Sequence, residues 1–351
     1  MYFKYLPTEL LIDIFLSCGS VIDVLQLSVV CRRFHHILNT TNKLHILYTV
    51  ASQEFSPVND IIQLLTQNES RPVHVHRDAP VSLPLLEQIV RVGRVARKWE
   101  AIYPFKKWKV DYENRRLLTD EESWRVRRAV YRLWLYHRAF HTRGFDRFSR
   151  GLRGVVLERA MLLHNWSTAE LAEIEDVRSV VAEVVRGHIC PSNGTIERKF
   201  KKRFPSAQGT DQLVFNFRPS AAEVNALAFG TGCIGDHFYT TPHSLESPAK
   251  YRSRFRNDLA HDPGSEGWGD EIPHYYIVQD MMKLDPDQVL WLREHAPMKE
   301  QVEAYVASLG EWFRDNGETF GDTLAWVMNE RGEDITELKA CIEDREMGVI
   351  Q

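Results

Sequence analysis

Few residues in this sequence have the type and spacing of a catalytic or cofactor-binding motif. The run Gly230-Thr-Gly-Cys-Ile-Gly235 matches the G-x-G-x-x-G string of dinucleotide sites. Such a site needs a strand before the glycines and a helix after them, so that free N–H groups meet the pyrophosphate. Residues 221–229 have a helical pattern instead, and Pro242 and Pro248 follow the glycines. We therefore interpret the run as a glycine-rich turn.

Metal-binding and acid–base chemistry have little support either. His74 and His76 would lie on one face of a strand, but histidines in loops or at strand edges are commoner than metal ligands. The acidic run 120–122 suits the first turn of a helix, where negative charge is favourable. No G-x-S-x-G, H-E-x-x-H or Walker string occurs. We predict no catalytic residue, no metal and no cofactor, so the sequence favours a protein that is not an enzyme.

The elements around these residues are predicted to be helices. Thr119 with Glu122, and Ser167 with Glu170, have the spacing of capping boxes, in which each side chain satisfies a free backbone N–H of the other residue. Each pair precedes a segment with apolar residues at helical spacing. The two predicted helices cover residues 120–141 and 169–188.

Prolines mark two more helix starts. Pro84 and Pro286 each suit the first turn of a helix, where the missing N–H costs nothing, and the first of these helices should run toward Trp99. Strand signals are scarce: the better one is 213–217, and 74–77 is weaker. We find no repeat of 20 to 50 residues, which argues against solenoids and propellers.

This pattern predicts a mainly α protein with an N-terminal helical unit and a large irregular helical domain. The expected organisation is the N-terminal unit at 1–48, a basic helical half at 49–204, a loop-rich segment with a weak strand at 205–273, and acidic C-terminal helices at 274–351. We expect residues 49–351 to pack as one body. Little β structure is expected.

Composition indicates a globular intracellular protein. Apolar residues make up 44% of the chain and charged residues 26%, with a mean hydropathy of −0.34. No apolar run reaches the roughly 18 to 20 residues of a membrane helix, and Glu9 and Asp13 interrupt the one run that could pass for a signal peptide. The five cysteines are odd in number and widely spaced, which suits a reducing compartment. We predict a cytoplasmic or nuclear location, no secretion and no membrane.

Charge is segregated along the chain. Residues 91–160 hold 19 Lys/Arg against 8 Asp/Glu, and residues 257–351 hold 7 against 22. We expect the two stretches to pair within one fold, because a nearly neutral whole produces no long-range field. The rival interpretation is nucleic-acid binding by the basic stretch, where cations alternate with aromatics. The acidic counterweight argues against it.

Residues 6–38 have the pattern of two short amphipathic units. Pro7 and Glu9 suit the start of the first helix, and Ser20 and Asp23 offer N-caps for the second. Two such short helices cannot bury their apolar residues against each other alone. Either the rest of the chain or another protein must cover them. The apolar residues are Leu10, Leu11, Ile14 and Phe15 in the first unit, and Val24, Leu27, Val30, Cys31, Phe34, Ile37 and Leu38 in the second.

The order and spacing of these residues resemble the F-box, a short helical module at the N-terminus of ubiquitin-ligase substrate receptors. The matching part is about a tenth of the chain, and the long helical body after it resembles that of fungal-type F-box proteins. The segment between Phe15 and Asp23 is longer than usual for the family and has Gly19-Ser20 where proline is frequent, which bears on affinity for a partner and not on the fold. The resemblance rests on Leu6, Pro7, Glu9, Leu10, Leu11, Ile14, Phe15, Asp23, Leu25, Leu27, Ser28, Val30, Cys31, Arg32 and Phe34.

The resemblance implies a non-catalytic substrate receptor. Residues 6–38 would dock on the small adaptor subunit of an SCF-type cullin–RING ubiquitin ligase, and the C-terminal body would present a protein substrate for ubiquitination. The residues implied for the adaptor contact, or for holding the helices of the module together, are Leu6, Pro7, Leu10, Ile14, Phe15, Leu25, Leu27, Val30, Cys31 and Phe34.

Three alternatives stay open. The helix pair could be ordinary core in a larger α domain, the module could be an interaction scaffold outside a ligase, or the body could bind nucleic acid. Burial distinguishes the first: an interaction module should leave part of the stripe at Ile14, Phe15, Leu25 and Val30 exposed.

Overall fold

The computed structural model describes most of the chain, and three predicted features lie outside the part described. These are the strands at 213–217 and 74–77 and the glycine run at 230–235. The described residues are 6–40, 43–67, 73, 79–109, 111, 113–145, 147–203, 267–269 and 271–350.

The protein is mainly α, as the sequence predicts. Helices join through turns throughout the described ranges, which contain no strand, and none of the described helices is long and apolar enough to cross a membrane. The chain divides into two compact units. Unit 1 is Met1–Val181, Leu284–Asp287 and Thr319–Gln351, and unit 2 is Ala182–Lys283 and Gln288–Glu318.

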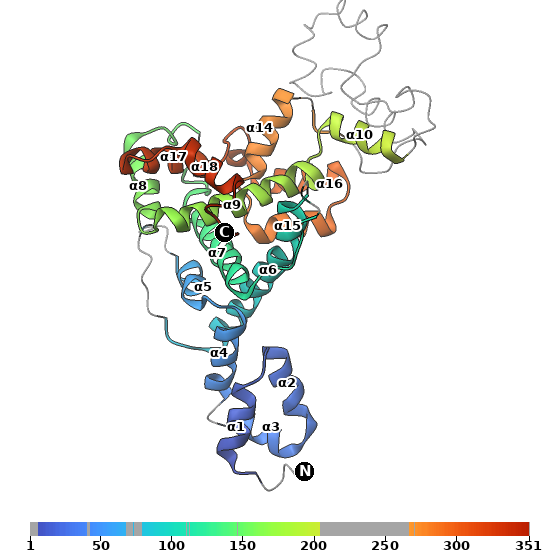
Figure 1. Ribbon diagram of the computed structural model, residues 1–351, viewed down its shortest axis with the longest axis vertical. Helices are drawn as coiled ribbons and strands as arrows, with labels where there is room; N and C mark the ends of the chain where they lie inside the picture. Colours follow the sequence, from blue (N-terminus) through green and yellow to red (C-terminus); the bar gives the residue numbers. More distant parts are fainter. Residues whose placement is uncertain are drawn as a thin grey trace, which may run out of the picture. The chain divides into compact units, whose positions relative to one another are not determined.

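Unit 1 begins with a small group of short helices. The first three, α1, α2 and α3, lie beside one another, and α4 leads from them to the rest of the unit (Figure 1). α1 and α2 each pack against both α3 and α4. The four helices are α1 (Thr8–Leu16), α2 (Val21–Val30), α3 (Arg32–Asn39) and α4 (Lys43–Glu54).

The body of unit 1 is built around two long helices that pack against each other, α6 and α7. The capping box predicted at Thr119 and Glu122 is present at the start of α7, and Ser167 and Glu170 bond reciprocally before α9. Both predicted helices are confirmed, and the one at Pro84 runs further than expected. The helices are α5 (Val58–Leu65), α6 (Leu83–Lys107), α7 (Asp120–Phe140), α8 (Arg153–Leu163), α9 (Thr168–Val184), α17 (Phe320–Arg331) and α18 (Ile335–Glu343).

Side chains of α7 hold the turn between α4 and α5. The Tyr131 hydroxyl donates to the Phe55 carbonyl over 3.1 Å, and Arg127 Nε donates to the Ser56 carbonyl over 2.9 Å. α6 approaches the same turn so closely that a Cβ at Gly93 would lie 2.3 Å from the Phe55 ring. Glycine is therefore required in the middle of this helix despite its low helix propensity.

A carboxylate without solvent exposure ties distant parts of unit 1 together. Asp176 in α9 accepts hydrogen bonds from the Tyr103 hydroxyl at 2.6 Å, from Lys107 Nζ at 2.8 Å and from the backbone N–H of Val349 at 3.1 Å. Lys107 also donates to the Ile342 carbonyl over 3.1 Å. Burial beside Asp176 raises the pKa of Tyr103, which therefore remains a neutral donor. One carboxylate thus joins α6, α9 and the chain after α18.

A second group of buried polar contacts joins α7 to two later parts of unit 1, Leu284 and the start of α17. His137 is buried, and its Nδ1 lies 2.9 Å from the Leu284 carbonyl. Since the carbonyl can only accept, Nδ1 carries the proton. The Tyr136 hydroxyl lies 3.0 Å from the hydroxyls of both Thr319 and Thr323. These bonds fix α17 on α7.

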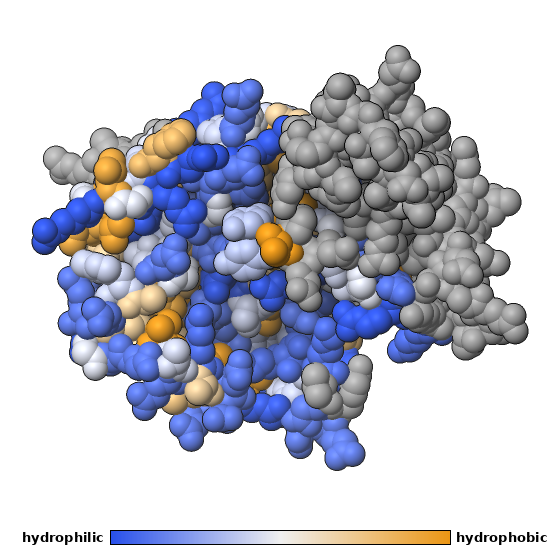
Figure 2. Space-filling view, turned by 90° about the horizontal axis from the view of Figure 1, so that it is seen from above, coloured by the Kyte–Doolittle hydropathy of each residue, from blue (hydrophilic) through white to orange (hydrophobic). Residues whose placement is uncertain are grey.

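The basic stretch 91–160 pairs with carboxylates from several parts of unit 1. Among the described residues, three pairs reach the acidic stretch: Arg91–Asp287 at 3.0 Å, Arg138–Asp285 at 3.7 Å and Arg150–Asp322 at 3.0 Å. Others go elsewhere, among them Arg132–Asp60 at 2.8 Å and Arg128–Glu173 at 2.6 Å. The expected pairing of the two stretches is therefore only part of the arrangement. The face seen from above is mostly hydrophilic where it is described, with scattered hydrophobic residues (Figure 2).

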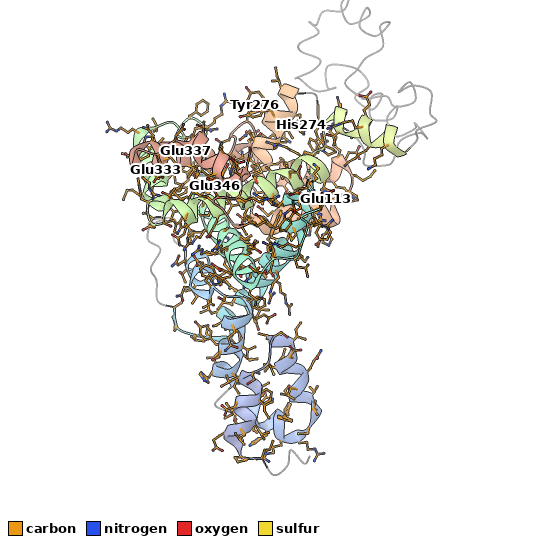
Figure 3. All side chains as sticks on the ribbon, in the orientation of Figure 1. Glu113, His274, Tyr276, Glu333, Glu337 and Glu346 are labelled. Carbon is orange, nitrogen blue, oxygen red and sulfur yellow. The ribbon has the colours of Figure 1, made fainter. Side chains whose placement is uncertain are left out.

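Hydrogen bonds within unit 2 hold the start of α10 and the helix α14 in place. Its α10 is preceded by backbone bonds from Trp268 N to the Pro191 carbonyl and from Asn193 N to the Gly269 carbonyl. His274 in α14 donates through Nε2 to the Cys190 carbonyl over 2.8 Å (Figure 3). The elements are η2 (Val185–Ile189), α10 (Asn193–Arg203), α14 (Glu271–Met281), α15 (Pro286–His295), α16 (Lys299–Leu309) and η5 (Glu311–Phe313), of which α15 starts at the predicted proline and begins in unit 1.

We expect Asp176→Ala to lower the free energy of unfolding by about 3 to 5 kcal/mol, because it leaves Lys107, whose side chain is only 14% exposed, without a counter-charge. Tyr103→Phe removes one hydrogen bond and should cost about 1 kcal/mol. The matched control is Glu121→Ala, which removes a carboxylate that is 73% exposed and pairs with Arg125 and should cost under about 1 kcal/mol. Urea unfolding of the three variants checks the order, and equal losses for Asp176 and Glu121 would contradict it.

His137 should make folding stability depend on pH. Burial lowers the pKa of His137 to about 4, whereas an unfolded histidine has a pKa of about 6.5. The unfolded state therefore gains a proton first, and stability present above pH 6.5 is lost as the pH falls toward 4, by up to about 3 kcal/mol. Thermal melts across this range should show a shallower slope for His137→Gln than for the wild type. Superimposable profiles would rule out this role for His137.

Candidate protein-interaction surface

The first helices of unit 1 owe their ends to local bonds. The Ser20 side chain caps α2 by accepting from the backbone N–H of Asp23 over 3.1 Å. The Ser20 hydroxyl also lies 2.7 Å from the Asp23 carboxylate, so the two side chains close the turn between α1 and α2. Pro7 precedes α1 as its N-cap residue. The cap predicted at Ser20 is therefore confirmed, whereas Pro7, predicted in the first turn, lies one residue before α1 and makes no side-chain capping bond.

The second of the two amphipathic segments predicted within residues 6–38 forms two helices in the structure, not one. The chain is extended at Cys31, with φ −153° and ψ 159°, and this residue ends α2 and starts α3. Two features weaken the end of α2. Val29 and Val30 are β-branched and lose side-chain freedom in a helix, and the Ser28 hydroxyl bonds to the Leu25 carbonyl at 2.6 Å.

The break lets α3 turn its apolar face onto α1. Phe34 meets Phe15 edge to face, with ring centroids 5.5 Å apart, and both side chains are buried. Such an aromatic pair contributes about 0.5 to 1.5 kcal/mol beyond the area that it buries. The other buried apolar residues of the three helices are Leu11, Val21, Val24, Ile37 and Leu38.

Polar contacts fasten this group at two points. The Glu54 carboxylate at the end of α4 accepts from the backbone N–H of Val21 over 2.8 Å. The Arg33 guanidinium donates to the Leu6 carbonyl, which holds the start of α1 against α3. Because four residues of α4 are themselves buried, the small group is attached to a helix with a core of its own.

A large part of the apolar surface of these helices is not covered by the chain. Leu10 and Leu25 are each 47% exposed, and Val30 is 70% exposed. Pro7 and Cys31 are exposed as well, whereas Leu6, Ile14 and Leu27 are half-buried. If the helices were an ordinary buried pair, these apolar side chains would be covered by the rest of the chain. The expectation that part of the stripe at Ile14, Phe15, Leu25 and Val30 stays exposed is confirmed, with Phe15 as the buried member.

The structure separates two roles that the sequence left together. Phe15 and Phe34 hold the helices to one another, and the other eight predicted residues are at least partly accessible. Two exposed apolar residues were missed: Ile22 at 47% and Val29 at 77% exposure. They form an i, i+3, i+7 stripe with Leu25, which lies beside the buried stripe of α2 and not across the helix from it. That spacing is visible in the sequence, but periodicity alone does not tell which stripe faces inward.

The chemistry available here is apolar contact. No described residues anywhere in the chain form a group of three or more His, Cys, Asp or Glu that could hold a metal ion. Side chains such as Leu10, Leu25 and Val30 carry no donor or acceptor and can act only by excluding water with a partner. The geometry therefore defines a protein-interaction module.

The comparison with protein families gives the module its class. A model described as F-box-like matches residues 3–45, which span α1, α2, α3 and the start of α4. The chain is an F-box domain protein, and the helical body follows this domain. No curated protein and no solved structure matches the chain.

Replacing Phe15 by alanine should unfold the module while the body stays folded. A buried phenylalanine lost from a core costs about 3 to 5 kcal/mol, which three short helices cannot absorb. The measurement is amide hydrogen exchange, in which protection should vanish over residues 8–39 and persist in α7. The control is Val29→Ala, an exposed site expected to cost under about 0.5 kcal/mol. Retained protection in the Phe15 variant would show that this ring does not hold the helices together.

Proposed function

We propose that residues 6–38 dock on the small adaptor subunit of an SCF-type cullin–RING ubiquitin ligase and that the helical body presents a protein substrate for ubiquitination. The observation that carries the proposal is the exposure of apolar side chains on a module matched by the F-box-like family model. A receptor of this kind makes and breaks no bond itself. It holds the substrate near the enzyme recruited by the ligase, so that the reaction is effectively intramolecular.

The residues proposed for the adaptor contact follow from exposure. They lie at the start of α1 and along the outer side and end of α2, and burial of each large apolar side chain would contribute about 1.5 to 3 kcal/mol before the costs of association. The same argument gives Phe15 and Phe34 an indirect role, since they shape the surface from beneath. The residues are Leu6, Pro7, Leu10, Ile14, Leu25, Leu27, Val30 and Cys31.

In the proposed role, a ubiquitin-ligase subunit would work in the cytoplasm or the nucleus.

The alternative function is a scaffold that uses the same module outside a ligase. The two differ in whether a cullin joins the complex, so reconstitution with adaptor and cullin separates them: adaptor binding without cullin recruitment would favour the scaffold.

Adaptor binding tests the proposal directly. Purified wild-type protein should bind recombinant adaptor, and Leu6→Ala/Pro7→Ala should weaken binding more than tenfold, because it removes apolar contacts that the accessible parts of both side chains would make with the partner. The matched control is Leu117→Ala, which truncates an apolar side chain that is 88% exposed outside the module. Isothermal titration calorimetry at 0.15 M and 0.5 M salt gives the affinities.

Binding should survive the higher salt, since apolar contacts are not screened. Equal affinity of the wild type and the double variant would sink the assignment of these residues, and no binding by the wild type would sink the proposed function. Alanine at positions 6 and 7 removes no buried side chain, so a loss of folding is not expected to interfere. Circular dichroism of each variant verifies this.

A further inference from the structure

The connection between α7 and α8 combines positive charge with exposed apolar side chains. Residues 143–154 contain four arginines and one aspartate. In the same segment Phe148 is 80% exposed and Leu152 is 58% exposed. Large apolar residues on a surface with a single sign of charge are typical of binding sites.

The outer face of α8 continues this apolar surface. Leu157 is 37% exposed and Met161, one turn further, is 56% exposed, while the charged Arg159 between them is only 4% exposed. A helix on the surface of a globular protein normally shows the opposite pattern. The departure is partial, because α8 also buries Ala160, Leu162 and Leu163. The helix packs on α17, buries one arginine and leaves two apolar side chains outside.

Arg159 also fixes the connection in place. Its guanidinium donates to the Arg150 carbonyl over 2.8 Å and to the Thr323 hydroxyl over 3.2 Å. At the other end of the connection the Phe145 ring packs on Phe140, with centroids 5.4 Å apart. A partner would therefore meet a preorganised surface and pay little for ordering it.

The arginines of this connection differ from most of those before it. Within the basic stretch, Arg127, Arg128 and Arg132 are committed to carboxylates inside unit 1. No ion pair joins Arg143, Arg147 or Arg153 to any residue of the described ranges, and Arg147 lies over the Phe148 ring at 5.1 Å. Three arginines without an ion pair to the described residues thus lie in the same segment of the chain as the exposed Phe148 and Leu152.

We propose that residues 143–161 bind an extended acidic segment of a protein partner, with apolar side chains of that segment seated on Phe148, Leu152, Leu157 and Met161. Carboxylates of the segment pair with Arg143, Arg147 and Arg153. Seen from above, hydrophobic and strongly hydrophilic residues lie intermixed on the side of unit 1 where α8 lies (Figure 2). If the chain is a substrate receptor, as proposed above, this partner is the substrate, and that identification rests on the proposed function. The binding of an acidic segment to this surface does not depend on it.

The surroundings favour a protein over a nucleic acid. The carboxylate of Asp322, 76% exposed, stands beside Arg150, and Glu330 contacts His164 at the end of α8. Such acidic groups repel a continuous phosphate backbone, whereas a peptide can place its carboxylates selectively. Leu152, Leu157 and Met161 are aliphatic and offer no ring for bases to stack on.

The test is selection of random 12-residue peptides, displayed on phage, on full-length protein. Peptides rich in Asp and Glu with Leu, Phe or Met between them should be enriched. Fluorescence anisotropy of the selected peptides should give affinities that fall more than tenfold for Arg143→Glu/Arg147→Glu/Arg153→Glu. They should fall similarly for Phe148→Ser/Met161→Ser. Both variants alter exposed side chains only.

A matched charge reversal on other exposed arginines controls for long-range electrostatics. Arg94→Glu/Arg115→Glu/Arg186→Glu makes the same change in net charge and should lower the affinity less than threefold. Equal losses in the two triple variants, or selection of peptides without acidic residues, would overturn the proposal. A labelled single strand of 20 thymidines is the nucleic-acid probe, and its binding, lost only in the triple variant at positions 143, 147 and 153, would assign the surface to nucleic acid instead.

The test is independent of the ligase. All of these variants leave residues 6–38 intact and should bind the adaptor as the wild type does. Loss of peptide binding with intact adaptor binding would therefore concern the inferred surface alone. Failure of adaptor binding by the wild type would concern the proposed function alone.

Discussion

Unit 1 depends on the burial of one carboxylate. Asp176 has no contact with solvent, and its three donors come from α6 and from the chain after α18. An ionised group in such a place is tolerated only when the donors are all present, because leaving it unpaired costs several kcal/mol. These bonds therefore fix the positions of α6, α9 and the last described residues relative to one another. Gly348, whose φ is +104°, brings the chain into contact with Asp176.

This fixed body allows the N-terminal module to keep an unusual surface. Three short helices hold a small core around Phe15 and Phe34, and their other apolar side chains remain accessible. Alone, such a group would gain too little from burial to stay folded. Attachment to α4, which is buried on its other side and held through the turn gripped by α7, supplies the missing support. The helices of the body thus support the fold of the module, whose exposed apolar side chains stay available for a partner.

Sequence predicted what is local and missed what depends on distant partners. The start of α7 was predictable because Thr119 and Glu122 cap each other within one turn, and the F-box resemblance was readable because it rests on order and spacing. The break at Cys31 was not predicted, since the series of apolar residues at helical spacing, with Leu27, Cys31 and Phe34, continues through it. Neither was the burial of Arg159, a charged residue whose partners, the Arg150 carbonyl and Thr323, meet it only in the folded chain.

The discontinuity of unit 1 sets an order for folding during synthesis. Asp176 and Val349 are 173 positions apart in the chain, and the whole of unit 2 is made between them. The ribosome thus releases α6, α7 and α9 long before their last bonding partner exists. If unit 2 folds first, the contact between Asp176 and Val349 forms more easily. A compact insert shortens the effective loop between them and so lowers the entropic cost of closing it. Until the chain reaches Val349, the Asp176 carboxylate lacks one of its three donors.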